Sequence, residues 1–171
     1  MVNGMKLNKK RIINILVFLS FIIYAFNVPK ETTGHLLIPP LTESYWSWKY
    51  NIQLIPFFFV GDLINQYNSS GFNWFFWNAV KLSFYNILLL LPLGVYLSIY
   101  KVSSIKRATF IIFLVSFAIE SMQLLLSYFG YIFPRSFNVD DLILNTLGGI
   151  VGYVTFEQMK KFFYKIRGRE G

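Results

Sequence analysis

The stretch PRSFNVDDLILNTLGG, residues 134–149, decides the fold because it joins charged side chains directly to an apolar run. Arg135, Asp140 and Asp141 come first, and apolar residues follow with Asn145 and two glycines among them. A charged side chain deep in a bilayer costs at least about 2.5 kcal/mol, so such residues are expected to face protein or a polar cavity. The stretch therefore predicts a helix that starts near a membrane surface and carries a polar face.

The composition of the whole chain points to a membrane protein. Its 171 residues are 55% hydrophobic and 20% aromatic, and only 14% are charged, a balance that a small soluble domain would not keep. The chain has no cysteine, and His35 is its single histidine, which argues against disulfides, thiol nucleophiles and Cys/His zinc sites. No metal or other cofactor is expected.

Four apolar segments are long enough to approach the roughly 20 residues that a spanning helix needs. They are residues 12–28, 82–100, 108–129 and 139–156. The segment 29–81 between the first two is rich in aromatic residues, with runs around Trp46 and Trp74 that are typical of the lipid headgroup region. The sequence therefore predicts an all-α membrane protein, a bundle of about four transmembrane helices with an interfacial outer segment.

This reading divides the chain into five parts. They are a cytoplasmic basic N-terminus (1–11), a first transmembrane helix (12–28), an outer aromatic interfacial segment (29–81), a three-helix core (82–159) and a cytoplasmic basic tail (160–171).

The lysines and arginines predict the orientation of the helices. With the N-terminus in the cytoplasm, twelve of the 16 basic residues fall on the inner side and four on the outer side, as the positive-inside rule expects. The net charge of +8 is thus explained by short clusters that flank apolar runs, and no basic face for nucleic acid is expected. Both termini are expected in the cytoplasm, and the lipid bilayer is the expected partner.

Polar residues inside the predicted spans lie at similar depths. Glu120 and Gln123 are three residues apart and share a helix face, and so do Asp141 and Asn145, four residues apart. With the predicted orientation, these side chains and that of Asn86 fall in or near the outer half of the membrane. The sequence therefore predicts a polar site open to the outside, with candidate ligand-binding residues Asn86, Glu120, Gln123, Arg135, Asp140, Asp141 and Asn145.

Structural roles compete with this functional interpretation. Glu120 could join helices through a hydrogen bond or ion pair, Asp140 and Asp141 could cap a helix start, and Arg135 could anchor to headgroups. Gly148 and Gly152 have the spacing that permits close helix packing. Pro92 is expected to kink its helix, together with Gly94.

The order of these motifs resembles the VanZ-like family. The resemblance covers about residues 51–153 and rests on four stretches: NIQLIPF (Asn51, Pro56, Phe57), NILLLLPLG (Asn86, Pro92, Gly94), ESMQ (Glu120, Gln123) and RSFNVDDLILNTLGG (Arg135, Asp140, Asp141, Asn145, Gly148, Gly149). The family often has an acidic residue where this chain has Asn138. The resemblance implies a membrane protein of the bacterial envelope and a family association with resistance to the glycopeptide teicoplanin.

Three functions remain open from the sequence. The first is a non-enzymatic protein that binds an amphiphile, either a lipid-linked wall precursor or a lipoglycopeptide. The second is an intramembrane enzyme acting on an envelope lipid, with Glu120 or Asp141 as general base; it is disfavoured because the chain offers few catalytic side chains. The third is a transporter or flippase subunit, which four helices would form only as an oligomer or with a partner. Whether the chain forms an oligomer is left open.

Overall fold

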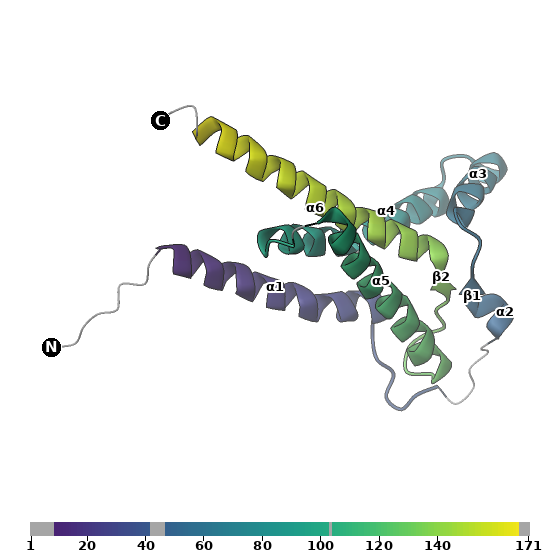
Figure 1. Ribbon diagram of the computed structural model, residues 1–171. Coiled ribbons are helices and arrows are strands. Elements are labelled where there is room, and N and C mark those ends of the chain that lie inside the picture. The colour runs from purple at the N-terminus through teal and green to yellow at the C-terminus, as the bar shows by residue number, and fades with distance from the viewer. Residues whose placement is uncertain (1–8, 42–46, 103, 168–171) are drawn as a thin grey trace.

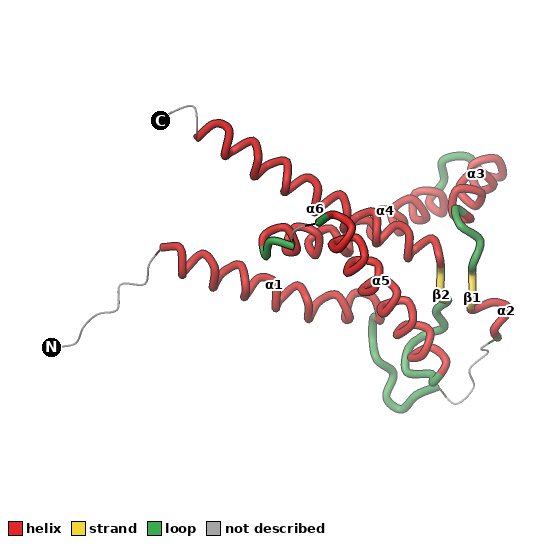
Figure 2. Tube along the Cα trace, in the orientation of Figure 1, coloured by secondary structure: helices red, strands yellow, loops and turns green. Residues whose placement is uncertain are grey.

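A computed structural model describes residues 9–41, 47–102 and 104–167 of the chain (Figure 1). In chain order its elements are α1 (Lys9–Thr33), α2 (Trp48–Asn51), β1 (Ile52–Gln53), α3 (Phe58–Ser70), α4 (Trp74–Ile99), α5 (Ile105–Tyr128), β2 (Phe137–Asn138) and α6 (Val139–Arg167). The protein is mostly helical, as expected, and the two short strands are a departure from an all-helical chain (Figure 2). Trp46, expected in the lipid headgroup region, lies outside the described residues, and so do Lys6 and Arg169, two of the basic residues expected on the inner side.

Three of the described helices are long and apolar enough to cross a membrane: α1 from Arg11, α4 and α5. They contain the predicted spans 12–28, 82–100 and 108–129 to within one residue at the C-terminal ends, but α1 continues through Pro29 and α4 begins at Trp74. The first eight residues of α4 were assigned by the sequence analysis to the interfacial segment. The helix α6, which contains the fourth predicted span, is not among these three, because charged and polar residues dilute its apolar part.

The long helices run back and forth between two ends of the molecule (Figure 1). At the end that we call the basic end, α1 begins, α4 connects to α5 and α6 finishes; its side chains include Lys101, Lys106 and Lys165. At the opposite end, which we call the strand end, β1, β2 and α3 gather (Figure 2). Consecutive long helices are therefore antiparallel, as in a membrane bundle with short connections.

Glycines bring α4 and α6 into direct backbone contact. A methyl group at Gly94 would overlap the carbonyl oxygen of Gly149, and methyl groups at Gly148 and Gly152 would overlap the carbonyl oxygens of Ile87 and Leu91. Small residues spaced four apart allow such close crossings. These glycines therefore pack helices, as their spacing in the sequence indicated.

Pro92 lies within α4, which is assigned as one continuous helix. Gly94, two residues further on, serves the contact with α6. The hydroxyl of Tyr24 in α1 donates a hydrogen bond to the carbonyl oxygen of Leu89 at 2.8 Å, next to the carbonyl of Leu88 that Pro92 cannot pair. This bond attaches α1 to α4 beside a core formed by Leu90, Leu93, Ile112 and Ile119.

Candidate functional site

Two sequence motifs that are far apart in the chain meet at the strand end. The strands β1 and β2 pair in parallel, with Ile52 opposite Phe137 and Gln53 opposite Asn138. Asn51, which is buried, extends this junction: its Nδ2 donates to the carbonyl oxygen of Arg135 at 3.1 Å. The NIQLIPF stretch is thereby held against the RSFNVDD stretch.

Asp140 caps a helix other than its own. Its two carboxylate oxygens accept hydrogen bonds from the backbone N–H groups of Phe57 at 2.5 Å and of Phe59 at 2.8 Å, at the start of α3. Phe57 has a φ of 61°, in the left-handed region, which a non-glycine residue adopts only when its surroundings hold it there. Since both oxygens have these partners and the residue is only 2% exposed, the structure gives Asp140 a positioning role.

Asn138 caps α6. Its side-chain oxygen accepts a hydrogen bond from the backbone N–H of Asp140 at 2.9 Å, the usual geometry of an asparagine that precedes a helix. Its own backbone N–H donates to Oε2 of Glu120 at 3.3 Å. The start of α6 is therefore attached to the middle of α5 through this residue.

Glu120, Asp141 and Asn86 form what we call the carboxylate cluster, contributed by α5, α6 and α4. Nδ2 of Asn86 donates to Oδ1 of Asp141 at 2.6 Å, and the two carboxylates are close enough for mutual repulsion if both are charged. Glu120 is 2% exposed. Three separate helices thus direct polar groups to one place inside an apolar bundle.

Arg135 is a cation close enough to act on both carboxyl groups of this cluster. Its guanidinium attracts both Glu120 and Asp141 electrostatically, but it is exposed and forms no ion pair; the ion pair found among the described residues is Lys160 with Glu157. Its backbone N–H donates a hydrogen bond to Oγ of Ser127 at 2.9 Å. The hydrogen bond therefore holds the backbone of Arg135, while its side chain is exposed.

Asn145 lies one helical turn after Asp141 and is 1% exposed. Its side-chain oxygen is buried, and within the described part of the chain no donor reaches it, which is uncommon and costly in a protein interior. On the facing helix, Oγ of Ser116 reaches the carbonyl oxygen of Leu142 at 3.4 Å. Asn145 therefore leaves one acceptor unused beside the carboxylate cluster.

Gln123 has a partner elsewhere. It lies on the buried face of α5 with Ser116 and Glu120, but its amide donates to the carbonyl oxygen of Thr32 in α1 at 2.5 Å. This bond holds the C-terminal end of α1 against α5. Of the seven predicted ligand-binding residues, four lie at or beside the carboxylate cluster: Asn86, Glu120, Asp141 and Asn145. Arg135 lies at its edge. Asp140 and Gln123 instead form contacts that position α3 and α1.

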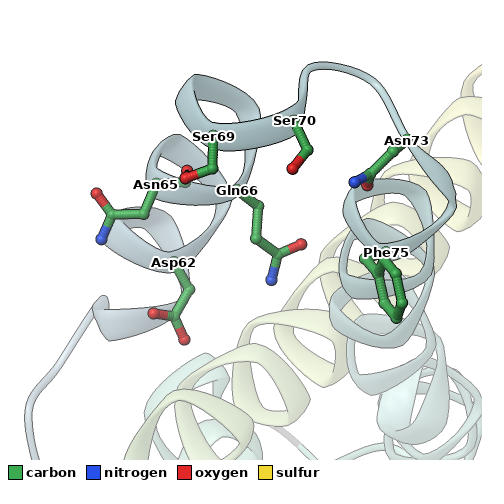
Figure 3. A pocket seen from close by; sticks show the side chains of 7 residues that line it. All are labelled: Asp62, Asn65, Gln66, Ser69, Ser70, Asn73 and Phe75. Atoms are coloured by element: carbon green, nitrogen blue, oxygen red, sulfur yellow. Dashed lines mark hydrogen bonds between the residues drawn. The ribbon is translucent and has the colours of Figure 1, made fainter.

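Two further polar features were not identified from the sequence. At the basic end, Oε1 of Glu157 accepts hydrogen bonds from Lys160 Nζ at 2.6 Å and Ser98 Oγ at 2.7 Å, and these bonds lower the pKa of Glu157. At the strand end, a pocket of about 390 Å³ lies between α3 and the start of α4 (Figure 3). The contact of Glu157 could have been predicted from its three-residue spacing to Lys160. The pocket could have been predicted from the polar face of α3.

The fold and the cluster together define a class: a helical membrane protein with acidic and amide side chains buried between its apolar helices. Residues 12–161 match the sequence model of the VanZ/LLP1 family. The chain therefore belongs to the VanZ/LLP1 family, and the resemblance seen in its motifs is confirmed. Comparisons with curated proteins and with solved structures found no match.

Proposed function

We propose that this chain is a multi-pass protein of a bacterial cell membrane in which α6 forms a fourth span and both termini are cytoplasmic. Its 29 residues exceed the length that a bilayer requires, and glycines hold α6 against α4 along the apolar part. Basic residues at the α4–α5 connection and at the end of α6 gather at one end of the bundle. The positive-inside rule assigns that end to the cytoplasm, so the carboxylate cluster lies towards the outside.

The cluster is the proposed site for an amphiphile in the outer leaflet, either a lipid-linked wall precursor or a lipoglycopeptide such as teicoplanin. The observation that carries this proposal is Glu120, a 2% exposed carboxylate in an apolar helix that has no cation paired with it in the described part of the chain. Buried ionisable groups in membrane helices are rare because they cost free energy, and they commonly mark ligand or ion sites. The unused oxygen of Asn145 adds an acceptor at the same place.

The proposed action is binding without catalysis. Asn86 holds Asp141 through a hydrogen bond, so the cluster presents acceptors in a fixed arrangement, and Arg135 offers a side chain that can turn towards an anionic group. Teicoplanin resistance, through capture of the antibiotic or of the precursor that it binds, is the proposed consequence.

Susceptibility of a glycopeptide-sensitive Gram-positive host tests the proposal. Cells expressing wild type, Glu120→Gln, Arg135→Ala or Glu31→Gln would be compared at matched membrane levels. The expected result is that wild type and Glu31→Gln raise the inhibitory concentration of teicoplanin, because Glu31 is an exposed carboxylate away from the cluster, and that Glu120→Gln and Arg135→Ala do not. Unchanged resistance in both cluster variants would refute the proposal.

A further inference from the structure

The pocket between α3 and α4 has no part in the carboxylate cluster, and its lining is polar. Asp62, Gln66 and Ser70 line it from α3, while Asn73 and Phe75 line it from the turn and from the start of α4. Figure 3 shows Gln66 extending from α3 into the space between the two helices, with Asn73 and Phe75 on the facing side. The pocket is open to the surface and has a volume of about 390 Å³.

The polar side chains of this pocket have unused hydrogen-bonding groups. Among the described residues, no side-chain hydrogen bond is formed by Asp62, Gln66 or Ser70, and Oε1 of Gln66 is buried without a donor. Asn73 uses its Oδ1 to accept from the backbone N–H of Phe76 at 2.9 Å, which leaves its amide donors. With Asn65 and Ser69, which also line it, the pocket offers both acceptors and donors, from a carboxylate, two hydroxyls and three amides.

The lining excludes two common kinds of ligand. A phosphate or carboxylate would meet the negative charge of Asp62, and none of the described residues that line the pocket is a lysine, arginine or histidine that could offset the repulsion. An acyl chain would desolvate the carboxylate and the amides without replacing their hydrogen bonds, which costs free energy. A cation could pair with the acceptors of the pocket but would leave its amide donors without partners. An uncharged ring that carries several hydroxyl groups matches both kinds of group, since each hydroxyl both donates and accepts.

Phe75 adds an apolar surface for one face of such a ring. Its side chain is 67% exposed, and it borders the pocket opposite Gln66. The other side of α3 carries Val60, Ile64 and Tyr67, which are exposed apolar residues suited to the boundary between headgroups and acyl chains. A ligand in the pocket would thus sit at headgroup depth, next to lipid.

We propose that the pocket between α3 and α4 binds an uncharged sugar ring, carried by a glycolipid headgroup or by a free saccharide. The location at the outer surface rests on the proposed function, because it follows from the same orientation of the bundle. The sugar would be recognised by Asp62, Gln66 and Asn73, with Phe75 against its apolar face.

Native mass spectrometry of the full chain released from lipid nanodiscs tests this proposal. Nanodiscs would contain a diglucosyl diacylglycerol, the sugar-free diacylglycerol or phosphatidylglycerol, all with the same acyl chains. The variants are Gln66→Leu and Asp62→Ala, with Gln158→Leu as a matched control on an exposed part of α6. Addition of the free disaccharide separates the two sources, because displacement of the glycolipid shows that the sugar alone is sufficient.

The expected result is selective retention of the glycolipid by wild type and Gln158→Leu. Retention falls about three- to tenfold in Gln66→Leu, as loss of one neutral hydrogen bond would give, and about ten- to a hundredfold in Asp62→Ala, as loss of a hydrogen bond to a charged group would give. Equal retention of the three lipids, or retention unchanged in both pocket variants, would overturn the proposal. Circular dichroism confirms folding, and Ser70→Leu replaces any variant that fails to fold. Glu120→Gln is measured in parallel: loss of resistance there with normal glycolipid retention separates the pocket from the carboxylate cluster.

Discussion

Asp140 and Asp141 are neighbours in the chain, yet their carboxylates have different partners. Asp140 accepts two backbone hydrogen bonds at the start of α3, whereas Asp141 accepts one from the side chain of Asn86 in α4. Successive residues of a helix point about 100° apart, so one pair of acidic residues can serve two neighbours. The result is a division of roles, in which Asp140 positions α3 and Asp141 remains in the carboxylate cluster.

Replacement of Asp140 by alanine is expected to lower the free energy of unfolding by about 1–3 kcal/mol, because two backbone donors lose their acceptor. It should also speed hydrogen exchange in the first turn of α3. Both effects can be measured on the protein in nanodiscs, by thermal unfolding and by exchange followed with mass spectrometry. Asp62→Ala is the control, since the exposed side chain of Asp62 in α3 forms no hydrogen bond with another described residue. Equal exchange in α3 of wild type and Asp140→Ala would contradict the assigned role.

At the scale of elements, the contact between α4 and α6 depends on glycine on both sides. Gly94 of α4 faces Gly149, while Gly148 and Gly152 of α6 face the backbone of α4 at Ile87 and Leu91. Gly149 also faces the side chain of Ile112 in α5. The helix α6 can therefore pack closely against two helices at once, which brings Asp141 to Asn86 and to Glu120.

Gly94→Ala is expected to destabilise the bundle by about 1–3 kcal/mol, as overpacking of a tight interior does, because the new methyl group would overlap backbone atoms of α6. Gly61→Ala is the matched control, since a methyl group there meets nothing within 4 Å and alanine favours a helix by up to about 1 kcal/mol. Thermal unfolding of both variants in nanodiscs provides the measurement. A lower midpoint for Gly61→Ala than for Gly94→Ala would be inconsistent with this packing.

The contact of Glu157 with Lys160 and Ser98 predicts a pH dependence at the basic end. Hydrogen bonds from Lys160 and then Ser98 lower the pKa of Glu157 from its ordinary value of 4.5. A carboxylate whose pKa is lower in the folded state stabilises the protein fully above the unfolded pKa, and that contribution disappears as the pH falls through the folded value. The difference in unfolding midpoint between wild type and Glu157→Gln is therefore expected to shrink below pH 4.5. A constant difference between pH 7 and about pH 3 would exclude this origin.

At the scale of the whole molecule, the proposed orientation can be tested directly because the chain has no cysteine. His35→Cys introduces a thiol in the α1–α2 connection, and Ser104→Cys introduces one in the α4–α5 connection at the basic end. A membrane-impermeant thiol reagent added to intact cells is expected to label His35→Cys, with Ser104→Cys labelled only after the membrane is opened. The reverse pattern would place the carboxylate cluster on the cytoplasmic side.

The sequence predicted the main part of the fold because apolar length is a local property. The spans around Phe18, Leu90 and Val115 can be predicted from apolar composition alone. The family can be predicted from the order of its motifs along the chain. The bounds of the helices were predicted less accurately. Trp74 begins α4, whereas the aromatic residues around it had favoured a segment in the lipid headgroup region. The hydrogen bond from the backbone N–H of Phe57 to Asp140 could not be predicted, because the two residues are 83 positions apart in the chain. A capping residue is usually expected at the start of its own helix.

The candidate site was predicted in part for the same reason. Helical spacing placed Glu120 and Gln123 on one face, but a spacing does not show which neighbour each side chain meets. In the structure, Gln123 forms a hydrogen bond with α1, and Glu120 forms one with Asn138 just before α6. The function of the cluster that remains, Glu120 with Asp141 and Asn86, stays a prediction.

Binding of teicoplanin to the purified full chain in nanodiscs, measured by isothermal titration calorimetry, tests the central claim most directly. Wild type is expected to bind beyond the level of empty nanodiscs. Glu120→Gln, which keeps the shape and removes the ionisable carboxyl group, is expected to bind at least about tenfold more weakly, as the loss of about 1.4 kcal/mol would give. Equal binding by wild type and Glu120→Gln, or no binding above empty nanodiscs, would contradict the claim.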